Sequence, residues 1–107
     1  MEMKSNVLLV DNKEDYLKTI NGYQPNLIVS DYQMPKFDGF SALLLRNNLL
    51  PNVPFIMLTG SVNEEVAVKC MKNGADDYVI KEHIKRLGQA ILNALDKKQN
   101  ENERKRI

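Results

Sequence analysis

Four short, unbroken apolar runs decide what this chain can fold into. They occupy residues 7–10, 27–29, 55–58 and 78–80. Continuous apolar runs of this length are typical of strands buried on both faces, as in a parallel sheet. Segments with helical spacing lie between the runs, which predicts an α/β fold with helices on both faces of the sheet. Right-handed crossovers would place the four strands side by side in chain order.

The segments between the runs carry helix signals. The first, 12–20, is predicted to bury one side, formed by Tyr16, Leu17 and Ile20. Asp38 is placed to cap a second helix that continues to about residue 47. Ser61, with Glu64 three residues later, resembles a capping box, and Gly74 stands where the third helix should end. The apolar face of that third helix is expected to comprise Val62, Val66, Cys70 and Met71.

The last helix should begin near Glu82, with an apolar face formed by Ile84, Leu87, Ile91 and Leu95. Beyond it the sequence turns strongly polar, so we expect a domain over 1–96 and a charged helical tail or linker over 97–107. The size, 107 residues, suits one core.

Charge and cysteine content exclude several classes of function. The net charge is +1, so no electrostatic footprint for nucleic acid or an anionic membrane is visible. No helix-turn-helix pattern is present, and the apolar runs are too short to span a membrane. Cys70 is the single cysteine, which favours a reducing, cytoplasmic setting, and its place on an apolar stripe predicts burial.

Each predicted strand ends in a residue that suits phosphoryl chemistry. The ends are Asp11 with Asn12, Asp31, Thr59 and Lys81. Parallel strands present their carboxyl ends along one edge, where open α/β sheets bind ligands. Paired acids there would bind Mg²⁺, and a hydroxyl and an ammonium would bind phosphoryl oxygens around an aspartyl nucleophile. Taken singly, each residue would more often be a cap or a turn residue, so the prediction depends on all of them converging.

These positions resemble the receiver domains of response regulators. The resemblance rests on the motifs LLVDN, VSDYQMPKFDGF, FIMLTG, KNGADDY and YVIK, which cover nearly the whole chain. It implies a flavodoxin-like fold and a two-component signalling switch that takes phosphate from a histidine kinase or phosphotransfer protein. Asp31 would be the phosphoacceptor, Lys81 and Thr59 would contact the phosphoryl group, and Tyr78 would move with Thr59. The implied Mg²⁺ ligands are Asp11, Asn12, Asp31 and the backbone carbonyl of Gln33.

The chain departs from the family pattern at three places. Asn12 stands where the family has a second acid, which predicts weakened Mg²⁺ binding. Glu82 follows Lys81 where many receivers have proline, a variant that resembles receivers fused to hybrid histidine kinases. Asp11 and Asp31 are only twenty residues apart, less than half the family interval, which predicts four strands rather than five. A longer natural connection between residues 11 and 26 is the alternative, and it would restore the fifth strand.

A shortened connection would make 7–10 an edge strand without protective charges and would remove one covering helix. A homodimer through that edge or through the uncovered sheet face is therefore expected. A second function stays open, namely an interaction module with impaired or absent phosphorylation. A phosphatase of the haloacid dehalogenase type is disfavoured because Lys13 occupies the position of its second acid. His83, the single histidine, is expected at the surface without a role.

Overall fold

The computed structural model describes residues 7–10, 12–22, 24–34, 37–61 and 63–105. A parallel sheet of four strands in the order β1-β2-β5-β6 runs through its centre. The strands are β1 (Val7–Val10), β2 (Leu27–Asp31), β5 (Phe55–Thr59) and β6 (Asp77–Ile80). Both the four-strand sheet and its strand order confirm the prediction from the sequence. A small antiparallel hairpin, β3 (Gln33–Met34) and β4 (Phe37–Asp38), was not predicted.

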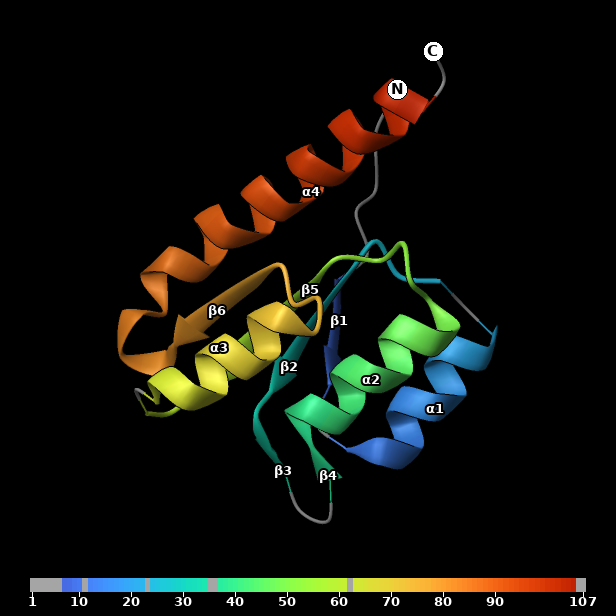
Figure 1. The fold of residues 1–107 in the computed structure, drawn as a ribbon. Helices are drawn as coiled ribbons and strands as arrows, with labels where there is room; N and C mark the ends of the chain where they lie inside the picture. Colours follow the sequence, from blue (N-terminus) through green and yellow to red (C-terminus); the bar gives the residue numbers. More distant parts are fainter. Residues whose placement is uncertain (1–6, 11, 23, 35–36, 62, 106–107) are drawn as a thin grey trace.

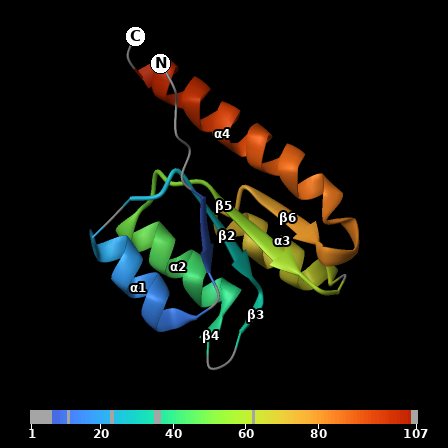
Figure 2. The same cartoon turned by 180° about the vertical axis from the view of Figure 1, so that it is seen from behind.

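Three helices cover one face of the sheet and one helix covers the other (Figures 1 and 2). The three are α1 (Lys13–Gly22), α2 (Gly39–Leu49) and α3 (Glu64–Lys72). The fourth, α4 (Lys85–Lys105), follows the short 3₁₀ turn η1 (Lys81–His83) and extends past the end of the sheet. Successive right-handed crossovers in one direction place every connecting helix on the same face, which explains the unequal cover.

Two apolar clusters lie against the two faces. The larger joins Tyr16 and Ile20 of α1 to Leu43 and Cys70, as their helical spacing predicted, and to Phe55 of β5. Burial raises the pKa of Tyr16 to about 12, and its hydroxyl donates to the carbonyl of Ala42 at 2.9 Å. The smaller cluster, under α4, consists of Leu27, Val29, Ile56, Val79, Ala90 and Ala94.

Several details of the helices differ from the sequence prediction. Asn63, rather than Ser61, caps α3, because its side-chain oxygen accepts from the amide of Val66 at 3.2 Å. Met71 and Ile84 are exposed and do not belong to the apolar faces on which they were predicted. Met71 lies on the exposed side of α3, and Ile84 lies between η1 and the start of α4. Val62 lies outside the described residues.

Other predicted details are confirmed. Asp38 caps α2 by accepting from the amide of Ser41 at 2.7 Å. Gly74 follows α3 with a φ of 101°, a conformation that favours glycine. Cys70 is buried, which raises the pKa of its thiol, and His83 is exposed.

The two edges of the sheet are protected very differently. On β1, Val7 and Leu9 point away from the three-helix face and remain 39% and 69% exposed. On β6, the guanidinium of Arg86 lies across the edge, donating to both carboxylate oxygens of Asp77 and to the carbonyl of Tyr78. Charged side chains at an edge hinder pairing with another strand, so only the β6 edge carries this protection among the described residues.

Candidate functional site

The carboxylate of Asp31 is held at the end of the central strand β2. Asp31 lies opposite Leu58 of β5, and the next amide, that of Tyr32, donates to the Leu58 carbonyl at 2.8 Å. The amide of Gly39 then donates to the Tyr32 carbonyl at 2.7 Å, which ties the start of α2 to the end of β2. The backbone on either side of the acid is therefore fixed.

Lys81 reaches Asp31 from the end of β6. Its Nζ lies 2.9 Å from Oδ1 of Asp31, with the two side chains 50% and 34% exposed. That Oδ1 atom is itself shielded from solvent and receives no other hydrogen bond from the described residues. The structure thus brings together two residues that lie fifty positions apart in the sequence, at the carboxyl edge of the sheet.

Thr59 lies at the same edge, and its side-chain hydrogen bonds go to Ser61. Its buried hydroxyl donates to the carbonyl of Ser61 at 3.3 Å and accepts from the Ser61 amide at 3.4 Å. Tyr78 is two positions earlier on β6 than Ile80, the partner of Thr59, so Thr59 and Tyr78 project from the same face of the sheet. The Tyr78 hydroxyl is shielded from solvent and has no hydrogen-bond partner among the described residues.

The predicted metal ligands are only partly visible. Asp11 lies outside the described residues, although Val10 before it is opposite Ser30, the residue before Asp31. Asn12 caps α1, since its Oδ1 accepts from the amide of Asp15 at 2.8 Å and its Nδ2 donates to the Asp15 carboxylate at 2.8 Å. The described residues contain no cluster of three His, Cys, Asp or Glu side chains able to hold a metal ion. The carboxylate of Asp31 and nearby carbonyl oxygens are nevertheless donors that suit Mg²⁺.

Sequence reasoning missed the role of Gly39. A Cβ built at this position would lie 2.6 Å from the backbone oxygen of Asp31, 2.9 Å from the Cα of Tyr32 and 2.5 Å from the sulfur of Met57. Only glycine lets the start of α2 approach the chain behind the acid so closely. The Asp38-Gly39 pair indicated a turn in the sequence. The close approach of Gly39 to β2 and β5 depends on tertiary packing, which the sequence does not display.

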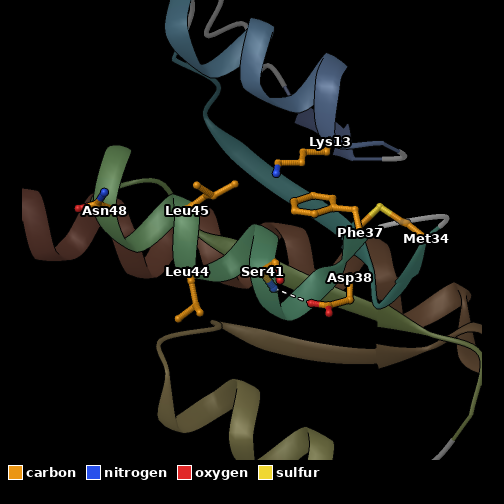
Figure 3. A pocket seen from close by; sticks show the side chains of 8 residues that line it. All are labelled: Lys13, Met34, Phe37, Asp38, Ser41, Leu44, Leu45 and Asn48. Carbon is orange, nitrogen blue, oxygen red and sulfur yellow. Dashed lines mark hydrogen bonds between the residues drawn. The ribbon is translucent and has the colours of Figure 1, made fainter.

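A hollow of about 720 Å³ lies beside this edge, between α1, the β3–β4 hairpin and α2 (Figure 3). Lys13 lines it from α1, facing Phe37, Ser41 and Leu45 on the other side. None of the predicted site residues lines it. The site is therefore the shallow edge around Asp31 and Lys81 rather than a deep cavity.

A parallel α/β sheet with an acid and a lysine meeting at its carboxyl edge defines a class of ligand-binding proteins. Within that class, the model of the response regulator receiver domain matches residues 1–92, and the chain belongs to this family. The family is that of two-component signalling.

Individual relatives agree with this assignment. The DNA-binding transcriptional regulator NtrC of Proteus hauseri is 32% identical over 97 residues, which cover 86% of this chain and 20% of the regulator. The chain thus spans about a fifth of that relative's length. The receiver domain of NtrX from Brucella abortus superposes with a TM-score of 0.75 at 24% identity, covering 85% of this chain and 98% of that domain. The beryllofluoride-activated NtrC4 receiver domain dimer gives a TM-score of 0.70 at 24% identity over 89% and 99% of the two chains.

Proposed function

We propose that Asp31 is a phosphoacceptor and that the chain works as a phosphorylated switch. The observation that carries the proposal is the 2.9 Å contact between Asp31 and Lys81 at the carboxyl edge of a receiver fold. A carboxylate beside a fixed ammonium is suited to accept a phosphoryl group, because the ammonium neutralises phosphoryl oxygens as charge develops.

The donor would be the phosphohistidine of a histidine kinase or phosphotransfer protein. An oxygen of Asp31 forms a bond to phosphorus while the bond between phosphorus and the histidine nitrogen breaks, and that nitrogen recovers a proton from solvent. Lys81 holds the transferred group, and hydrolysis by water later restores the carboxylate. Thr59 would turn from Ser61 towards the phosphoryl group, with Tyr78 following on the same face of the sheet.

Replacing Asp31 by Asn tests the acceptor. With acetyl phosphate and Mg²⁺, we expect the wild-type chain to gain the mass of one phosphoryl group and Asp31→Asn to gain none. Intact-mass spectrometry measures both, and Asp38→Asn serves as a control because Asp38 caps α2, whereas the ion pair of Lys81 is with Asp31. Equal labelling of the wild type and Asp31→Asn would contradict the proposal.

The metal site is proposed to consist of Asp11, Asp31 and the backbone carbonyl of Gln33, with Asn12 as a weak fourth ligand. A bound Mg²⁺ would offset the charge of the carboxylates and of the incoming phosphoryl group. In the structure the Asn12 side chain caps α1, and an amide carries no charge to attract a cation. The site should therefore bind Mg²⁺ weakly.

Asn12→Asp tests how a negative charge at this position changes Mg²⁺ binding while a residue that can cap α1 is kept. Aspartate caps helices as well as asparagine does, so the bond from the Asp15 amide should be retained, while the bond from Asn12 Nδ2 to the Asp15 carboxylate is lost and a carboxylate is added. We expect Mg²⁺ affinity to rise about tenfold, the change that ~1.4 kcal/mol of added attraction gives. Titration followed by NMR measures it, with Asp15→Asn as a control for the neighbouring charge, and equal affinities in Asn12→Asp and the wild type would contradict the prediction.

A second candidate function is self-association through β1, which the exposed Val7 and Leu9 favour. An unprotected edge strand can pair with the same strand of another copy, and the β6 edge is obstructed by Arg86. A related receiver domain was solved as a dimer. We propose a homodimer through the β1 edge, either in addition to phosphorylation or in place of it. Binding of beryllofluoride with Mg²⁺ would support the first case, and its absence would support the second.

Leu9→Lys should weaken such a dimer, because a lysine at an edge disfavours strand pairing. The control is Leu92→Lys, since Leu92 is also exposed, at 59%, but lies on α4. Light scattering over a concentration series should show a dimer for the wild type and the control and a monomer for Leu9→Lys. A wild type that stays monomeric at high concentration would refute the prediction.

Three further proposals concern the whole protein. Among the described residues no helix is both long and apolar enough to cross a bilayer, and we propose a cytoplasmic location. The helix α4 continues to Lys105, and we keep the division into a domain over 1–96 and a helical tail over 97–107. A link to a hybrid histidine kinase is likewise a proposal, and it rests on Glu82 following Lys81.

A further inference from the structure

Two charged side chains form hydrogen bonds with the main chain of Tyr78. The Tyr78 amide donates to Oδ1 of Asp77 at 2.7 Å, and the Tyr78 carbonyl accepts from Nη2 of Arg86, also at 2.7 Å. The same guanidinium closes the arrangement by donating to Oδ1 and Oδ2 of Asp77 at 3.1 and 3.3 Å. We call these two residues, Asp77 and Arg86, the edge bracket.

The edge bracket lies at the outer edge of β6, where no neighbouring strand hydrogen-bonds to the peptide groups among the described residues. β6 is the last strand of the sheet, with β5 on one side and no strand on the other among the described residues. An outward-facing peptide there would ordinarily be held by water alone. Because Arg86 belongs to the first turn of α4, it ties the Tyr78 peptide to the helix that follows.

The Tyr78 side chain is in an unfavourable position that such a restraint would help to maintain. It packs against the cluster that contains Cys70, and its hydroxyl is buried without a partner among the described residues. A buried hydroxyl that makes no hydrogen bond is unfavourable, so the ring would gain by turning towards water. A fixed main chain limits that movement.

We propose that Arg86, paired with Asp77, is a positioning residue that keeps the Tyr78 hydroxyl buried and thereby biases the switch. The effect on signalling rests on the proposed phosphoryl switch. Thr59 and Tyr78 project from the same face, so a Tyr78 side chain whose hydroxyl is already turned inwards leaves less to rearrange when Thr59 turns towards an anion on Asp31. Releasing the edge bracket should weaken anion binding without touching Asp31 or Lys81.

We expect the chain to stay folded when the edge bracket is removed. The Arg86–Asp77 pair is 50% and 29% exposed, and exposed ion pairs contribute little to stability. Arg86→Met keeps much of the aliphatic stem and removes the donors. Lys85→Met is the matched control, since Lys85 is the exposed preceding residue and loses the same charge. Arg86→Lys retains the charge with fewer donors and should give an intermediate result.

Two measurements test the proposal. The chain contains four tyrosines, so 3-fluorotyrosine labelling gives four fluorine resonances, and Tyr78→Phe identifies one of them. In Arg86→Met we expect the Tyr78 resonance to move and its solvent isotope shift to increase, as for an exposed ring. The dissociation constant of beryllofluoride with Mg²⁺ should rise about fivefold, the size of one lost hydrogen bond.

The outcomes separate the positioning role from the proposed function. An unchanged Tyr78 resonance in Arg86→Met, or the same change in Lys85→Met, would overturn the positioning role. A changed resonance with unchanged beryllofluoride affinity would overturn the link to the switch. A wild type that does not bind beryllofluoride would contradict the proposed function, while the fluorine comparison would still decide whether Arg86 positions Tyr78.

Discussion

Lys81→Met is expected to slow phosphorylation of the chain by acetyl phosphate about a hundredfold, because one fixed donor to the phosphoryl group is lost. In the wild type, Nζ of Lys81 lies 2.9 Å from Oδ1 of Asp31, so no other described side chain is as well placed to neutralise charge at this carboxylate. The rate is followed by intact mass at fixed Mg²⁺ concentration.

The fold should survive this change. Half of the Lys81 side chain is exposed, and the pair it forms contributes about 0–1 kcal/mol to stability. Thermal unfolding of Lys81→Met should therefore stay close to that of the wild type. Lys85→Met removes an exposed lysine four residues away and should phosphorylate normally. If Lys81→Met phosphorylated at the rate of Lys85→Met, the role of Lys81 would have to be abandoned.

The arrangement of the strands and the meeting of Asp31 with Lys81 could be predicted from the sequence. Both follow from continuous apolar runs that each end in a polar residue, together with the rule that parallel strands end at one edge. The crossover rule also predicts the strand order. These features depend on local pattern and on topology, which a sequence displays directly.

Features that depend on tertiary contacts could not be predicted in this way. Arg46 lies on α2 and is buried, donating to the carbonyl of Val53 at 3.2 Å and to that of Gly74 at 2.5 Å. Burial lowers the pKa of its guanidinium, with Asp76 acting in the opposite direction. Nothing in its spacing distinguishes it from an exposed arginine. The sequence prediction took Ser61 as the cap of α3 and missed Asn63, because both residue types cap helices well.

Gly39→Ala is expected to destabilise the chain by roughly 1–3 kcal/mol, as overpacking in a tight interior does. In most helices the same change is favourable, because alanine loses less conformational freedom on folding. Here the added Cβ would lie 2.6 Å from the Asp31 carbonyl oxygen and 2.9 Å from the Tyr32 Cα, both of them backbone atoms. The amide of Gly39 donates to the Tyr32 carbonyl and Asp38 caps the same turn, so α2 cannot simply slide away.

Gly88→Ala is expected to change the stability of the chain in the opposite direction. Gly88 lies within α4, and a Cβ there would meet no atom within 4 Å. It should therefore stabilise the chain by about 0.5–1 kcal/mol. Denaturant unfolding compares the two variants, and acetyl phosphate labelling should be slower in Gly39→Ala alone, because the displaced backbone is the one that carries the Asp31 carboxylate. Equal stabilisation by both alanines would show that α2 does not press against the end of β2 as described.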